Sequence, residues 1–338
     1  MREHSIRWSS IQTFAVAGIG VFLEALSGTW DVYSHRIVFT EGDPWWNPAH
    51  ILLYAGALAV FLSLLSNYRG GHRTYSNPVP VRRAQYVILS GAIIQIIGAG
   101  LNELQHRLIE SEPALSPAHS IFTVGMVITG IGAVVGLTLV RPIPKLFDKH
   151  LPLKILVNLS VILSFSAVWI ISAGSFIYTA LAFPSDASRV SSTILVVLIS
   201  SLILVASVRS TRIGFASAIT AVYVMTNFMF LVGYSRLESY LPLGILVGVL
   251  SDSIWASFSK SSKTIAATIL GSAVGALAYF LYFPFSFYAL QLLWPPTAAQ
   301  LAILLILGGF GGLLGYFIVS FASHSIGLRA VDVGTIES

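Results

Sequence analysis

Two stretches of this chain each contain an oxygen-bearing side chain, a histidine four residues later, and a further histidine that follows a Pro-Ala pair. The two sets are Asp31, His35 and His50, and Asn102, His106 and His119. Residues four apart share one face of a helix. If the later histidine begins an antiparallel neighbouring helix, it returns toward the earlier pair. Each set can therefore converge on one metal ion.

The ligand types indicate which metal such a site would hold. Neutral imidazoles combined with a carboxylate or amide oxygen suit Cu(II), Zn(II) or Fe(II) better than Mg²⁺ or Ca²⁺. Three protein ligands leave one coordination position open, as in catalytic metal sites. Glu24, seven residues before Asp31, and Glu103, beside Asn102, are candidates to accept hydrogen bonds from the ligating imidazoles.

The other four histidines and Asp252 do not belong to a ligand pattern of this kind. His4, His72, His150 and His324 fall in predicted inner loops or tails and stay unassigned. Asp252, in the run GVLSDSIWAS, is expected to be interfacial or bonded to serine, so it is left outside the site.

Composition determines which elements must position these residues. Hydrophobic residues make up 55% of the chain and charged residues 10%, and the mean hydropathy is +0.82. Such values indicate an integral membrane protein. Continuously apolar runs near the length of a bilayer crossing favour helices over barrel strands. We therefore predict an all-α polytopic transmembrane bundle with about ten spans: 11–31, 49–67, 84–103, 118–140, 155–182, 190–208, 213–233, 241–258, 263–283 and 298–322.

The distribution of basic residues predicts the orientation of the bundle. With both termini cytoplasmic, all of the 19 lysines and arginines lie on the inner side except Arg36, Arg107, Arg189 and Arg236. This asymmetry is the usual mark of cytoplasmic loops. We therefore expect an N-in, C-in protein of the cell membrane, with both histidine-containing loops extracytoplasmic.

Charge and cysteine content exclude several classes of function. The net charge of +5 is spread over predicted inner loops, next to anionic lipid headgroups, so it indicates no nucleic-acid partner. The absence of cysteine excludes disulfides, thiolate metal sites and Fe–S clusters.

A basic, proline-containing loop at 141–154 suggests a division of the chain. Residues 1–140 form a four-span region with two similar metal-site hairpins, and residues 155–325 form a six-span region of unknown role. The second region contains runs such as GGFGGLLGYF, which favour close helix packing in lipid.

The run GLNELQHRLIESEPALSPAHSIFTVG resembles the signature of the C subunit of copper membrane monooxygenases, particularly archaeal ammonia monooxygenase. In that family Asn-Glu-x-x-His is followed thirteen residues later by a histidine that begins the next helix, the interval from His106 to His119 here. The earlier stretch resembles the same subunit's Asp-x3-His with a downstream Pro-Ala-His. The resemblance covers roughly residues 15–140 and implies two neighbouring copper sites. Their ligands would be Asp31, His35 and His50, and Asn102, His106 and His119.

The resemblance implies a component of a copper-dependent membrane monooxygenase, related to those acting on ammonia or methane. Its expected partners are A- and B-type subunits, O2 and a small substrate, and its metal is one or two copper ions, with zinc as the other candidate. A second hypothesis is a metal-ion transporter or sensor that uses the same histidine sets. A third is a b-haem electron carrier with two histidine ligands, although these histidines begin at helix ends rather than facing each other within the bundle.

Overall fold

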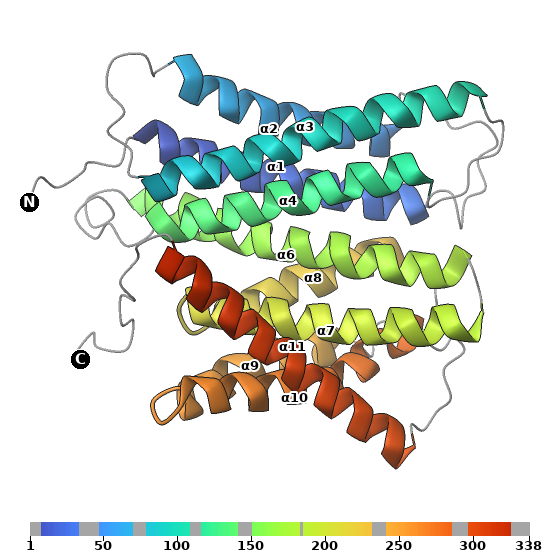
Figure 1. Ribbon diagram of the computed structural model, residues 1–338, viewed down its shortest axis with the longest axis vertical. Coiled ribbons are helices and arrows are strands. Elements are labelled where there is room, and N and C mark those ends of the chain that lie inside the picture. The colour runs from blue at the N-terminus through green and yellow to red at the C-terminus, as the bar shows by residue number, and fades with distance from the viewer. Residues whose placement is uncertain are drawn as a thin grey trace, which may run out of the picture. The chain divides into compact units, whose positions relative to one another are not determined.

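A computed structural model describes residues 8–33, 47–69, 79–108, 116–140, 151–182, 185–231, 241–285 and 297–325. Throughout these ranges the regular secondary structure is α-helical, which confirms the predicted all-α class (Figure 1). The helices described are α1 (Trp8–Tyr33), α2 (Pro48–Arg69), α3 (Val79–Leu108), α4 (Pro117–Val140), α6 (Leu151–Ala182), α7 (Asp186–Ser210), α8 (Phe215–Leu231), α9 (Leu241–Phe258), α10 (Lys263–Phe285) and α11 (Ala298–Ser325).

Seven of these helices are long and apolar enough to cross a membrane. They are α1, α2, α3, α4, α6, α7 and α11, whereas α8, α9 and α10 contain shorter apolar stretches. Each predicted span coincides with one described helix. The chain is thus a helical membrane protein, and the full count of ten crossings and the N-in, C-in orientation stay predictions.

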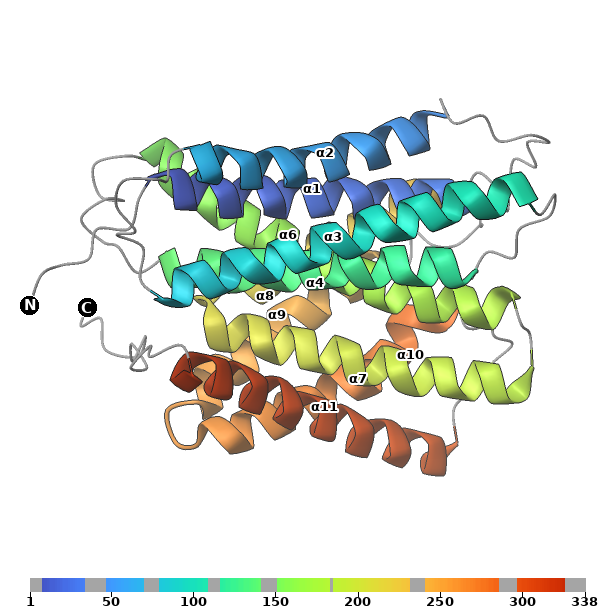
Figure 2. The same cartoon turned by 45° about the horizontal axis from the view of Figure 1, so that its top comes forward.

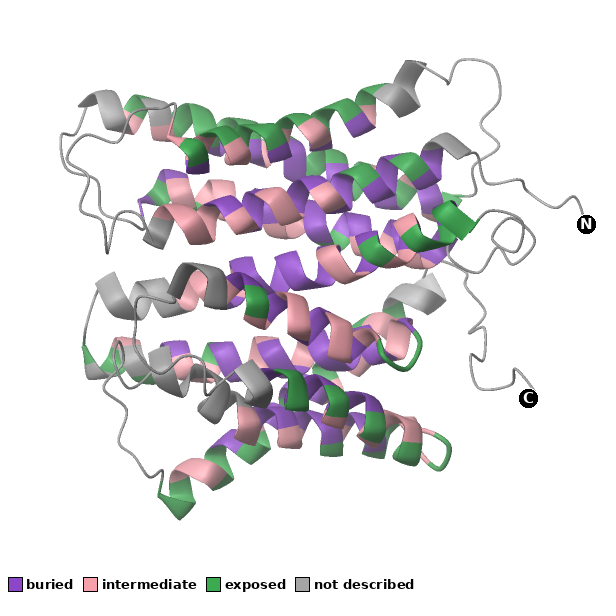
Figure 3. Cartoon of the chain, turned by 180° about the vertical axis from the view of Figure 1, so that it is seen from behind, coloured by how far each residue is buried: buried purple, intermediate pink, exposed green. Residues whose placement is uncertain are grey.

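The surfaces of the helices suit contact with lipid. One side of α2 exposes large apolar side chains at helical spacing: Ile51, Tyr54, Leu58, Phe61, Leu62 and Leu65. Figure 3 shows how buried and exposed positions alternate around the helices. Because an apolar face of this kind is covered by hydrocarbon in a bilayer, lipid is the natural partner of α2.

The chain divides into two compact units, Met1–Ile171 and Ser172–Ser338, with the boundary inside α6. The predicted division into a metal-site region, residues 1–140, and a six-span region, residues 155–325, concerns function and stays a prediction.

In the first unit, α1 meets α2 along a line of small and polar side chains that we call the α1–α2 seam. Its members on α1 are Thr13, Gly20, Glu24, Ser27 and Asp31, each of which touches α2. Their spacings of seven, four, three and four residues follow the heptad pattern of antiparallel helices packed at a shallow angle. The seam runs nearly the full length of α1.

The other helices of the first unit continue this antiparallel arrangement. Gly98 of α3 packs on the backbone of Phe122 in α4, and Gly130 of α4 packs against Val21 of α1. Gly91 of α3 also packs against Thr129 of α4, and Gly136 of α4 packs against Phe14 of α1, so both pairs of helices are antiparallel. α1 and α3 therefore run in one direction, and α2 and α4 run in the other. The junctions of both hairpins, α1 with α2 and α3 with α4, therefore lie at the same end of the unit (Figure 2). This end is called the hairpin end below.

In the second unit, glycines bring α10, α11 and α7 close together. A Cβ on Gly275 of α10 would lie 2.8 Å from the Cα of Gly308 in α11. The Ser201 hydroxyl of α7 donates to the carbonyl of Gly271 in α10 at 3.1 Å. Such close backbone approaches are how membrane helices gain packing energy.

Asp252 ties α9 to the start of α8. One of its carboxylate oxygens accepts hydrogen bonds from the backbone N–H of Ser217 at 2.9 Å and from the Ser217 hydroxyl at 2.6 Å. Ser217 is the third residue of α8, where backbone N–H groups have no partner within the helix. Asp252 is therefore bonded to serine, as the sequence predicted, and caps a neighbouring helix.

Replacing Asp252 with alanine should destabilise the second unit by about 1–2 kcal/mol, since it removes an interhelical cap. Asp252→Asn should cost much less, because an amide oxygen still accepts from the Ser217 N–H. Thermal unfolding in detergent measures both changes. Ser253→Ala is the control, since that exposed hydroxyl bonds only within α9. Equal melting temperatures for Asp252→Ala and the parent would contradict the assignment.

Candidate functional site

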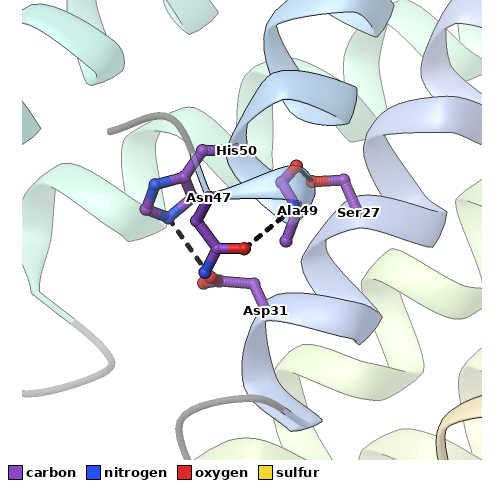
Figure 4. Close-up of polar contacts among 5 residues, drawn as sticks. All are labelled: Ser27, Asp31, Asn47, Ala49 and His50. Carbon is purple, nitrogen blue, oxygen red and sulfur yellow. Dashed lines mark hydrogen bonds and ion pairs between the residues drawn. The ribbon is translucent and has the colours of Figure 1, made fainter. Parts of the chain in front are cut away.

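The predicted ligands Asp31 and His50 meet at the hairpin end of the first unit. The His50 Nε2 lies 3.2 Å from the Asp31 Oδ1, and both side chains are about three quarters buried, with exposures of 21% and 26% (Figure 4). Asp31 is near the end of α1 and His50 is in the first turn of α2. The contact therefore joins α1 to α2 in the hairpin for which the sequence predicts the first metal site.

Two further contacts fix the first turn of α2. The side-chain oxygen of Asn47, directly before the helix, accepts from the backbone N–H of Ala49 at 3.1 Å. The Ser27 hydroxyl of α1 donates to the carbonyl of Ala49 at 2.6 Å. Asn47 is a helix N-cap, and Pro48 follows it at the first helical position, where proline is favoured. His50 thus follows a residue, Ala49, whose backbone N–H and carbonyl are both hydrogen-bonded to side chains (Figure 4).

The second hairpin repeats this local design at the start of α4. Ser116 accepts from the backbone N–H of His119 at 3.2 Å, and its hydroxyl lies 3.0 Å from the His119 Nδ1. Cap, proline, alanine and histidine therefore occur in the same order in both hairpins. With Nδ1 hydrogen-bonded to Ser116, Nε2 is the ring nitrogen through which His119 would bind a metal.

The register of α3 against α4 places Asn102 level with His119. Gly91 packs against Thr129, and Gly98 packs against Phe122. From the first contact to the second, the residue number increases by seven on α3 and decreases by seven on α4, as expected for antiparallel helices. Continued for one turn beyond Gly98, this register places Asn102 at the level of Ala118 and His119.

Asn102 also carries an unsatisfied acceptor. Its Oδ1 is buried and accepts no hydrogen bond from any group among the residues that the structure describes. Buried acceptors of this kind are rare and call for a ligand or another partner. This oxygen is the atom expected to bind the second metal ion.

The remaining predicted site residues are described incompletely or not at all. His35 lies outside the described ranges, and the side chains of Glu103 and His106 in α3 are not described. Among the described side chains, no three from His, Asp and Glu gather around one point. The structure thus brings together Asp31 and His50, and the register of α3 against α4 places Asn102 at the level of His119. The two complete triads stay predictions.

Glu24 is fully buried in the α1–α2 seam, with an exposure of 0%. Neither carboxylate oxygen is hydrogen-bonded within the described part of the chain, so no bond to an imidazole is recorded for it there. Seven residues separate it from Asp31, or about 10 Å along a helix. Its predicted role in orienting a ligating histidine stays a prediction.

The contact between Asp31 and His50 fits a bound transition metal. Two ligand atoms each about 2.0–2.1 Å from one ion, at angles between square-planar and tetrahedral values, are roughly 2.9–3.4 Å apart. The observed separation of Nε2 and Oδ1, 3.2 Å, falls in this range. The two groups could hold one ion with little rearrangement.

The Pro-Ala-His runs were predicted to begin helices, but the capping residues directly before them were not predicted. Asn47 and Ser116 each precede a proline that opens a helix. A cap residue followed by proline is a recognised start signal for helices, so the sequence contained this information. The role of Ser27 could not have been found in this way, because its partner is on another helix.

Comparison of the chain with protein-family models, with curated proteins and with solved structures finds no match in any of the three.

Removing the Ser116 cap should weaken metal binding in the second hairpin. Ser116→Ala loses the cap, worth about 1 kcal/mol, and the partner of the His119 ring, which typically changes metal affinity by roughly 10–100-fold. Competition with a chelator measures the affinity. Ser120→Ala, an exposed change one turn into α4, should leave it unchanged. The cap has no part in binding if both variants retain metal as the parent does.

Proposed function

We propose that this protein is a multi-pass membrane copper protein and a component of a copper-dependent membrane monooxygenase, similar to the C subunit of that family. The observation that carries the proposal is the 3.2 Å contact of Asp31 with His50 at the junction of α1 and α2. This is the position at which the family resemblance implies a copper site.

The residues of each hairpin have separate tasks. Asp31 and His50, together with His35, would hold one ion, while Asn102, His106 and His119 would hold the other. Copper, when bound, would supply the redox chemistry that activates O2 toward a small apolar or ammonia-like substrate. Asn47 and Ser116 keep the first turns of α2 and α4 in place, and the Ser116 hydroxyl, 3.0 Å from the His119 Nδ1, leaves Nε2 as the ring nitrogen open to a metal. The apolar helices around both hairpins limit access of water.

The proposal includes an orientation and partners. The hairpin end faces the outside of the cell membrane, and other monooxygenase subunits of A and B type complete the complex. The orientation is supported by the excess of basic residues in the predicted inner loops.

Accessibility of single cysteines checks this orientation. The chain contains no cysteine, so Thr40→Cys and Ser111→Cys each create a single reactive site. Both should react with a membrane-impermeant reagent added to intact cells, whereas His72→Cys should react only after the membrane is opened. The reverse pattern of labelling would overturn the N-in, C-in orientation.

The metal content of the purified protein tests the function. Protein isolated with its native partners from copper-replete cells should contain one or two copper ions per chain by elemental analysis. Electron paramagnetic resonance should give the spectrum of Cu(II) with nitrogen ligands. Stoichiometric zinc in place of copper, or failure to retain any added copper, would contradict the proposal.

A further inference from the structure

Glu24 is a buried acid whose position suggests a role separate from metal binding. It lies at the centre of the α1–α2 seam with an exposure of 0%, and neither of its carboxylate oxygens finds a hydrogen bond among the described groups. A carboxylate that is ionised and unpaired within a membrane carries a large free-energy cost. The acid is therefore suited to hold a proton and to release it only when a path is present.

The helices packed against α1 offer no charged partner at the level of Glu24. On α2 it faces Gly56, whose Cβ, if present, would lie 2.8 Å from the Glu24 Cγ. The segments 120–140 of α4 and 155–171 of α6 contain no titratable side chain. Tyr54 of α2 is about half exposed and belongs to its lipid-facing side. α3 meets α1 through Gln85 and Ser10, fourteen residues before Glu24. Apart from Glu24, the described titratable side chains of the seam are therefore Asp31 and His50, about 10 Å away along the helix.

The seam is closed on one side of Glu24. A Cβ on Gly20 would lie 2.8 Å from the carbonyl oxygen of Gly56 and 2.9 Å from the Cγ2 of Val60. The two backbones are in contact there. Water is therefore expected to reach Glu24 from the side of Asp31 rather than from the side of Thr13.

The seam contains a hydroxyl group on the other side of Glu24. Ser27 is one turn from Glu24 and one turn from Asp31, on the same helical face. Its buried hydroxyl donates to the carbonyl of Ala49, and its oxygen retains lone pairs that can accept (Figure 4). A hydroxyl that accepts one proton and passes on another can link Glu24 with the hairpin end.

We propose that Glu24 is a membrane-embedded proton acceptor and donor that exchanges protons with the hairpin end through Ser27 and water admitted from that end. In the forward step a proton from hydronium at the hairpin end adds to a carboxylate oxygen of Glu24 and leaves a neutral carboxylic acid. The reverse step returns the proton to water, and no electrons are transferred. The inference goes beyond the proposed copper function and does not require a bound metal.

Infrared spectroscopy of the full chain in lipid nanodiscs tests the path. The parent should show the C=O stretch of a protonated carboxylic acid, and Glu24→Gln should lack it. On transfer to D2O this band should shift. In Ser27→Ala the shift should be about tenfold slower, the effect of raising the barrier by roughly the energy of one hydrogen bond. Ser27→Thr, which keeps the hydroxyl, should exchange as the parent does.

Thr13→Val is the matched control for the infrared experiment. Thr13 belongs to the same seam, where its hydroxyl donates to the carbonyl of Ser63, but it lies beyond the closed contact of Gly20 with Gly56. Its replacement should leave the exchange rate unchanged. The absence of a band assigned to Glu24 at every pH, or equal exchange rates in Ser27→Ala and the parent, would overturn the proposal.

A hydrophobic carbodiimide tests from which side the proton comes, because it modifies protonated carboxyl groups within membranes. Sealed membrane vesicles of one orientation allow the pH to be raised on one side at a time, and mass spectrometry measures modification of Glu24. Alkaline pH on the side of the hairpin end, identified by labelling Thr40→Cys, should suppress modification, and alkaline pH on the opposite side should not. A response to the opposite side, or equally to both, would overturn the proposal.

Discussion

Replacing His50 with alanine should empty the first hairpin of metal. The variant loses one of three predicted ligands and the imidazole that lies 3.2 Å from the carboxylate of Asp31. Loss of a group that merely supports a ligand costs roughly 10–100-fold in metal affinity, so loss of the ligand itself should cost more. An open centre with three protein ligands has none in reserve. The amount of bound copper per chain is measured after dialysis against a chelator. It should fall by the amount that the first site holds.

Two controls make this result specific. His72→Ala should leave copper content unchanged, since the sequence places His72 in an inner loop with no ligand set around it. His119→Ala should remove only the copper of the second hairpin, and the double variant His50→Ala with His119→Ala should hold none. Circular dichroism of each variant confirms that the helices are intact. Equal losses of copper in His72→Ala and His50→Ala would show that the ligands are assigned wrongly.

The helical architecture could be predicted from the sequence because lipid imposes a simple rule. A crossing segment must be apolar and long enough, and its backbone must bond within itself. Runs of this kind located each of the ten helices in the described residues, including the short α8, Phe215–Leu231. The rule does not say which helices pack together. The contacts of Gly98 with Phe122 and of Gly20 with Gly56 depend on partners distant in sequence, and glycine spacing alone does not identify them.

The contact of Asp31 with His50 was predictable because both residues belong to one hairpin. The predicted ligands His35 and His106 are not described in the same detail, so the complete sites stay predictions. Asp31 and His50 were expected to meet because a short loop joins antiparallel helices, and their contact is present. Glu24 shows the limit of this reasoning. Glu24 and Asp31 share a helical face, so both side chains lie in the α1–α2 seam. They are seven residues apart, however, which is about 10 Å along the helix axis. The close contact of Gly20 with Gly56, on the side of Glu24 away from Asp31, depends on residues of α2 and could not be predicted from α1 alone.

The close contact of α3 with α4 at Gly98 should determine both the stability of the second hairpin and the position of Asn102. A Cβ at this position would lie 2.6 Å from the backbone nitrogen of Phe122 and 2.7 Å from its Cα. Backbone atoms cannot rotate away, so Gly98→Ala must push the two helices apart. Overpacking of this kind costs about 1–3 kcal/mol. Because Asn102 lies one turn further along α3, the separation should also withdraw its oxygen from His119.

Gly100→Ala is the matched control, since a Cβ at Gly100 meets nothing within 4 Å. Alanine there should be neutral or should stabilise the helix by up to about 1 kcal/mol, because glycine is a poor helix former. Both changes are made in the His50→Ala background, in which the second hairpin holds the only copper. Gly98→Ala should lower the unfolding temperature and weaken copper retention about tenfold or more, as expected when a ligand is displaced by roughly 1 Å. Gly100→Ala should do neither. If Gly98→Ala lowers stability but retains copper as tightly as Gly100→Ala, then Asn102 does not bind the metal together with His119.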